Sequence, residues 1–210
     1  MANILTRILV WPYEQWFLRT RNVGAIEGVV LIDYYKNTLH FRETFASALE
    51  GLRHTDPRRY ERVRLYIRYI MNFPIGYSGA GYIQHLKAFA TSFQPPPSEA
   101  AVRKSAIWYA SMLVHEATHG LLHARNIPFN SRSRERVEQL CSKEEHRFLD
   151  RAGLTPESLA KIKSLRSYHP ELYRKRWSSS PWRLFRESFR YTKQEKAKTK
   201  DQEQAALDKT

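Results

Sequence analysis

The sequence predicts an α+β domain that is predominantly helical and carries a small sheet. Its longer segments place hydrophobic residues on one helical face and begin or end at proline or glycine. Shorter runs rich in β-branched and aromatic residues flank a glycine-rich loop, a composition that favours strands. With 210 residues, 42% of them hydrophobic, the chain is long enough for one domain with a substantial core.

Residues 37–93 contain two predicted helices and two predicted strands. A helix is expected over residues 37–53, and a short one over 57–63, because Asp56 can cap it and Pro57 can open it. The run from Val63 to Met71 is predicted as a strand, although its imperfect alternation leaves a helix open. Beyond a loop, residues 82–93 could form a second strand.

The second half is predicted to be helical. The longest helix is expected over residues 103–125, with a cap near Ser98, and ends before Pro128. A second helix should cover residues 133–152 and stop at a glycine, and Thr155-Pro156 should open a third of about ten residues. We predict a single domain over residues 1–192, followed by a polar and basic tail over 193–210 that has too few apolar residues to fold.

The chain is strongly basic, and the excess lies towards its C-terminal end. The formal net charge is +14, and residues 161–200 alone carry 13 basic and 3 acidic side chains. In this basic region Trp177, Trp182 and Phe185 alternate with arginines, a mixture that suits base stacking together with phosphate contacts. The region could therefore dock on nucleic acid or an anionic membrane, or it could be a solvated tail.

The single cysteine, Cys141, excludes a disulfide within the chain and suits a reducing compartment. No run approaches 18 apolar residues, and the first residues lack the features of a signal peptide. We therefore expect a cytoplasmic protein. The apolar and aromatic start, with Trp11 and Trp16, should pack on its own domain, although a peripheral position on a membrane is an alternative.

A histidine-rich motif, L-V-H-E-A-T-H-G-L-L-H-A-R, lies in the longest predicted helix. His115 and His119 are four residues apart, so they share a helical face and can offer two imidazole nitrogens to one ion. Glu116 points about 100° away around the helix, where it can reach a water held by that ion. This spacing predicts zinc with two histidine ligands and Glu116 as a general base.

A third protein ligand should come from the following helix. His123 lies about 12 Å along the axis from His115 and is expected at the rim or in solvent. Glu138 is the preferred ligand because hydrophobic residues surround it in the sequence, whereas Glu135, between two arginines, is the alternative. Cys141 could replace that carboxylate as a thiolate ligand, or it could pack as a small hydrophobic residue.

The H-E-A-T-H motif at 115–119 and the R-V-E-Q-L-C segment at 136–141 resemble the zincin superfamily of metallopeptidases, and more narrowly the gluzincins. They are also similar to small bacterial proteins in which a V-H-E-A-T-H core precedes an R-x-E-x-x-C segment. The resemblance covers about 40 residues. It implies zinc held by His115, His119 and a downstream glutamate, with Glu116 as the base. It also implies an edge strand above the zinc, and residues 81–93 could form that strand, judged by their position in the sequence.

Two departures from these families concern the surroundings of the zinc. Arg125 stands where metzincins have a third histidine. Ser142 stands where several gluzincins have an aspartate that orients a ligand histidine. Other divalent ions fit similar ligands, so the identity of the metal is left open.

These patterns together predict a zinc-dependent metallopeptidase that hydrolyses peptide or protein substrates through a water activated by the ion. The oxyanion donor is left open among four residues: His146, Tyr168, His169 and Tyr173. The alternative is a non-catalytic, zinc-stabilised binding protein whose basic region, residues 161–200, docks on nucleic acid or an anionic membrane.

Overall fold

A computed structural model describes residues 12, 14–36, 38–73, 80–130 and 132–165. These residues form an α+β fold in which helices predominate around one mixed sheet, as the sequence predicts. The elements are β1 (Asn22–Ile26), β2 (Val29–Asp33), α2 (Phe41–Thr55), α3 (Pro57–Tyr66), β3 (Tyr69–Asn72), β4 (Ala80–Ile83), the 3-10 helix η1 (Gln84–Leu86), β5 (Ala88–Thr91), α4 (Glu99–Ala124), α5 (Arg134–Leu149) and α6 (Pro156–Leu165).

The sheet has the strand order β1-β2-β3-β5-β4. Its three central strands, β2, β3 and β5, run parallel, and the edge strands β1 and β4 are antiparallel to their neighbours. A two-residue turn joins β1 to β2, and both Glu27 and Gly28 have positive φ angles, 50° and 87°. This geometry suits the twist of a tight hairpin. The parallel pair β2 and β3 is connected through α2 and α3, as parallel strands require.

Each face of the sheet has its own hydrophobic cluster. Leu31, Ile70 and Phe89 point to the face covered by α2 and α4, where they join the main core. The opposite face buries Phe17 and Leu18, which come from the helical residues 14–20. Two side chains of the N-terminal segment therefore pack on the domain, whereas Trp16 is 54% exposed and Trp11 lies outside the described residues.

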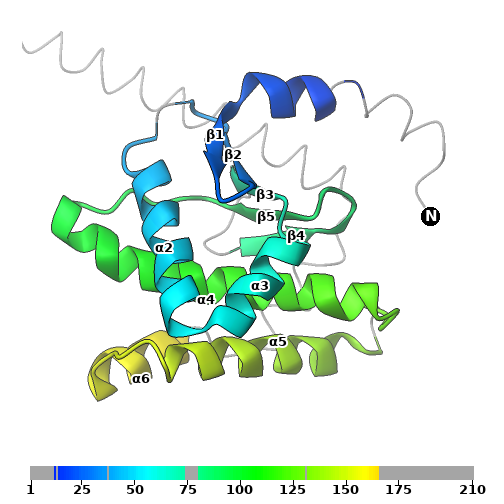
Figure 1. The fold of residues 1–210 in the computed structure, drawn as a ribbon. Coiled ribbons are helices and arrows are strands. Elements are labelled where there is room, and N and C mark those ends of the chain that lie inside the picture. The colour runs from blue at the N-terminus through cyan, green and yellow to red at the C-terminus, as the bar shows by residue number, and fades with distance from the viewer. Residues whose placement is uncertain (1–11, 13, 37, 74–79, 131, 166–210) are drawn as a thin grey trace, which may run out of the picture.

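Helix α4 is the centre of the fold. It runs between the sheet and α5, and it also contacts α2 and α3 (Figure 1). Residues 109–118 of this helix are buried without a break. A helix enclosed in this way is apolar on most sides, and the few polar side chains that it buries need partners inside the protein.

The helix boundaries predicted from the sequence agree with the structure, whereas both predicted strands have other boundaries in it. Helices α2, α3, α4, α5 and α6 all lie where the sequence predicts them, within a few residues at each end. The run at 63–71, predicted as a strand with a helix left open, is divided: residues 63–66 continue α3, and residues 69–71 lie in β3. The expected strand at 82–93 is interrupted by η1, which separates the edge strand β4 from the buried β5.

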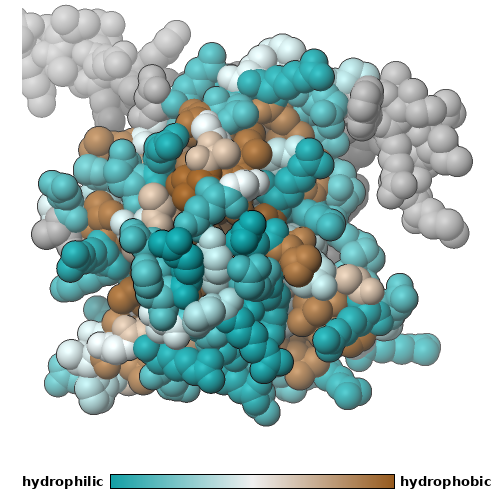
Figure 2. Space-filling view, in the orientation of Figure 1, coloured by the Kyte–Doolittle hydropathy of each residue, from teal (hydrophilic) through white to brown (hydrophobic). Residues whose placement is uncertain are grey.

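Within the described residues, no helix is both long enough and apolar enough to cross a membrane. On the face that α2 and α3 present, hydrophilic side chains predominate and hydrophobic ones are scattered among them (Figure 2).

Asp56 links three parts of the helical layer. Its Oδ1 accepts a hydrogen bond from the backbone N–H of Arg59 at 3.2 Å, which caps α3. Its Oδ2 forms ion pairs with Arg59 and with Arg151, the latter at 2.6 Å. Burial would raise the pKa of Asp56, but the bonds from these two arginines outweigh it and lower the pKa below 3.8.

We predict that Asp56→Ala lowers the free energy of unfolding by about 3 kcal/mol at pH 7, because it takes from the buried Arg59 one of its two carboxylate partners and removes a helix cap. A lowered pKa in the folded state means that the carboxylate stabilises the protein above its unfolded pKa. The difference between wild type and variant should therefore shrink as the pH falls below about 4. Urea unfolding at pH 7 and pH 3 measures both effects.

Glu61→Gln provides the control for this experiment, because Glu61 lies on the same helix with a side chain that is 61% exposed. We expect a change below about 0.5 kcal/mol. Equal losses in the two variants would contradict the role given to Asp56.

Candidate metal centre

Helices α4 and α5 lie side by side and run in opposite directions (Figure 1). A turn over residues 125–133 reverses the chain, and Pro128 lies within it. Early residues of α4 therefore meet late residues of α5, so that Ser111 contacts Glu145 and Leu122 packs with Val137. This arrangement brings the face of α4 that carries His115 and His119 against the buried face of α5.

The two separations between the Glu138 carboxylate and the motif histidines are close to those of ligands to one ion. The Oε2 of Glu138 lies 3.2 Å from Nε2 of His115 and 3.6 Å from Nε2 of His119. Tetrahedral zinc with bonds of about 2.0–2.1 Å holds neighbouring nitrogen and oxygen ligands about 3.4 Å apart. The buried Glu138 thus has suitable geometry, whereas Glu135 is exposed on α5 and bonds to Gln139.

A cysteine belongs to the same group of residues. The donor atoms of His115, His119 and Cys141 all lie within 4.8 Å of one another, so these three residues could hold a metal ion. Cys141 is also buried and packs with Leu122 and Val137. Its position therefore fits both roles that the sequence left open, that of a thiolate ligand and that of a small hydrophobic residue. Burial raises the pKa of its thiol, and the nearby carboxylates add to that effect.

Behind His115 lies a second carboxylate. The Oε2 of Glu145 is 3.0 Å from Nδ1 of His115, and its Oε1 accepts a hydrogen bond from the Ser111 hydroxyl at 3.0 Å. A carboxylate on the second imidazole nitrogen fixes the orientation and tautomer of a ligand histidine. Glu145 therefore takes the place of the aspartate that several gluzincins have at the position of Ser142. The sequence could have indicated Glu145, because it follows Glu138 by seven residues, or about two helical turns, and so lies on the same face of α5.

Charge favours a cation at this place. Burial alone would lower the pKa of His115, but its hydrogen bonds to Glu138 and Glu145 outweigh burial and raise the pKa to about 10. In the same way, burial would raise the pKa of Glu138, and the bonds from His115 and His119 lower it to about 2. The two carboxylates thus stabilise positive charge on or beside the imidazoles.

Glu116 lies on another side of α4 from the imidazoles and is also buried. It is close enough to His115 and Cys141 for its charge to raise the pKa values of both. Four residues further along the same face is Gly120, where an added Cβ would lie 2.7 Å from Cβ of Tyr66 and 2.8 Å from the hydroxyl of Tyr82. The glycine therefore lets α3 and the edge strand β4 approach the helix beside the motif.

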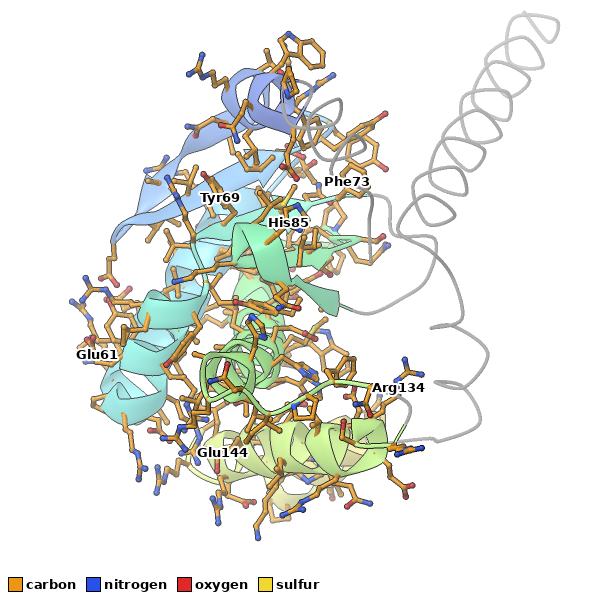
Figure 3. The ribbon with its side chains drawn as sticks, turned by 90° about the vertical axis from the view of Figure 1, so that its right-hand side faces the viewer. Glu61, Tyr69, Phe73, His85, Arg134 and Glu144 are labelled. Carbon is orange, nitrogen blue, oxygen red and sulfur yellow. The ribbon has the colours of Figure 1, made fainter. Side chains whose placement is uncertain are left out.

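An ionic cluster joins α3 to α4 and α5. Arg62 on α3 donates to the Thr118 hydroxyl at 3.0 Å and pairs with Glu144 at 2.8 Å. Arg59 also pairs with Glu144, which projects from α5 on its α3 side (Figure 3). Thr118 lies between the two motif histidines in sequence, so this cluster ties α3 to both helices of the site.

The rim of the site is formed by residues that follow the motif. The Phe129 ring meets the His119 ring edge-on at 5.2 Å, and Phe129 is 40% exposed. His123 is exposed and contacts Gln84, as expected for a residue at the rim. His146 is half-buried on α5. Tyr168, His169 and Tyr173, the other candidate oxyanion donors, lie outside the described residues.

Comparison of the chain with family models, with curated proteins and with solved structures finds no match. The resemblance to the zincins thus depends on the H-E-A-T-H motif and the R-V-E-Q-L-C segment alone.

We predict that Glu145→Gln weakens zinc binding by about 10–100-fold, because the amide no longer holds His115 as a carboxylate does. Competition with a chromophoric zinc chelator measures the affinity. Glu135→Gln is the matched control on the exposed side of the same helix, and its affinity should equal that of the wild type. Equal affinities in all three proteins would show that Glu145 does not support the ligand.

Proposed function

We propose that the chain is a zinc-dependent metallopeptidase that hydrolyses peptide bonds, with zinc held by His115, His119 and Glu138. The observation that carries the proposal is the position of Glu138 Oε2, at 3.2 Å and 3.6 Å from the two imidazole nitrogens. Catalytic zinc commonly has three protein ligands and keeps one position for water or substrate. Two histidines with one carboxylate are such a set.

The buried charges support a divalent ion. Glu116, Glu138 and Glu145 are all almost fully buried within the same region of α4 and α5. Burying carboxylates is costly unless positive charge compensates them. A dication between the imidazoles would supply that compensation.

The chemistry follows from the remaining groups. When bound, zinc acidifies a water molecule and polarises a substrate carbonyl. Glu116, which is not in the proposed ligand set, accepts the proton of the attacking water and returns it to the leaving nitrogen of the peptide. Glu145 bonds to Nδ1 of His115, so that Nε2 of the same imidazole is left for the proposed ion.

Glu116→Gln tests the enzymatic role. The variant should retain zinc, because the glutamine replaces no ligand, and should lose about 100-fold or more of the hydrolysis rate. The measurement is cleavage of a panel of quenched fluorescent peptides by zinc-loaded proteins, with the metal content determined on the same samples. A wild-type protein that binds zinc and cleaves none of the panel, or a variant as active as wild type, would contradict the proposal.

The third ligand is tested by replacing each candidate glutamate with alanine. Glu138→Ala should lower the affinity for zinc, measured by competition with a chromophoric chelator, because it removes the carboxylate that contacts both imidazoles. Glu135→Ala should retain the wild-type affinity, since Glu135 lies on the exposed side of α5. The reverse result would assign the ligand to Glu135.

A second candidate function is a non-catalytic, zinc-stabilised binding protein. The proximity of Cys141 to both histidines favours it, because four protein ligands make a closed, structural zinc site. In this case the basic region, residues 161–200, would dock on nucleic acid or an anionic membrane, and salt would weaken that association. Nearly all of this region lies outside the described residues.

A further inference from the structure

The buried face of α5 offers two donors to the same place. Glu138 and Cys141 are three residues apart, so they lie on neighbouring positions of one helical face. Glu138 approaches both imidazole nitrogens, and the Cys141 sulfur lies within 4.8 Å of a donor nitrogen of each ring. Two helices thus contribute four potential ligands, which equals the number that fills a tetrahedral site.

We infer that Cys141 is a direct ligand of the metal ion, and that it makes the centre selective for thiophilic ions such as zinc. This inference depends on the proposed function only for the presence of an ion between α4 and α5. It goes beyond that proposal in adding a fourth protein ligand and in predicting which ions the site prefers.

The geometry needs little adjustment. Bonds of about 2.3 Å to sulfur and about 2.05 Å to nitrogen place these atoms about 3.6 Å apart in a tetrahedral site. The upper limit of 4.8 Å on the observed separations exceeds that value by little more than 1 Å. Rotation of one cysteine side chain covers such a distance, so α4 and α5 can keep their places.

The environment of the sulfur favours a neutral set of ligands. Cys141 is fully buried against Leu122 and Val137, where uncompensated charge is costly. A dication with one carboxylate, one thiolate and two neutral imidazoles has no formal net charge.

The choice of ions follows from the softness of the ligands. Thiolate favours zinc and similar soft ions, whereas carboxylate and water suit magnesium, calcium and manganese. A site of two histidines and one glutamate would discriminate less between zinc and manganese than one that includes the thiolate. Cys141 should therefore affect which ion the site prefers more than whether the site binds an ion at all.

Cobalt substitution tests the bond directly, because thiolate bound to cobalt gives an intense charge-transfer band in the near ultraviolet. Cys141 is the single cysteine of the chain, so a thiolate band in the cobalt-loaded wild type has one source. We expect the band in the wild type and in Glu138→Gln, and we expect its loss in Cys141→Ser and Cys141→Ala. Circular dichroism of each variant checks that the fold is retained.

The selectivity is measured as the ratio of zinc to manganese affinities in the same proteins. It should fall by at least about tenfold in Cys141→Ala, because a soft ligand has been removed. A wild-type protein that binds cobalt without the thiolate band would overturn the inference, and so would an unchanged ratio in Cys141→Ala. Either result would leave the peptidase proposal standing, since Glu116→Gln tests that proposal separately.

Discussion

The hydrogen bonds of His115 with Glu138 and Glu145 are the interaction on which the arrangement of the two site helices depends. Helix α4 is enclosed by the sheet, α2, α3 and α5, so a polar side chain at its centre is largely shielded from bulk water. Such a group must find its partners within the protein. Helix α5 supplies them through carboxylates seven residues apart, and this spacing fixes how the two helices are aligned.

The ionic cluster on the α3 side restrains the same pair of helices from another direction. Arg62 connects Thr118 of α4 with Glu144 of α5, and Glu144 directly precedes Glu145 in the chain. A shift of α5 along its axis would therefore break contacts on two sides at once. Ligand geometry is sensitive to displacements of well below 1 Å, so this double restraint matters to a metal site. Stability and site geometry share one set of buried contacts.

Helical periodicity predicted which side chains of α4 and α5 lie together better than it predicted the sheet. The four-residue spacing of His115 and His119, and the hydrophobic neighbours of Glu138, are local properties that hold in any helix. The β1–β2 hairpin escaped prediction because its strands are only five residues long, and the run at 63–71, predicted as a strand, is divided because α3 extends over its β-branched start. The pairing of Glu145 with His115 was missed, although Glu145 follows Glu138 by seven residues and therefore shares its face of α5.

Glu116 bears on the choice between an enzyme and a scaffold. A structural site closed by four protein ligands needs no further carboxylate, and burying one costs free energy that better packing would avoid. Glu116 is nevertheless 5% exposed and lies one residue from a ligand histidine. A general base for the attack of water requires such a position. If Cys141 also binds the ion, hydrolysis needs either a fifth coordination position or the release of one α5 donor, and zinc allows five-coordination during a reaction. The position of Glu116 is therefore compatible with the proposed hydrolysis even if Cys141 completes the ligand set.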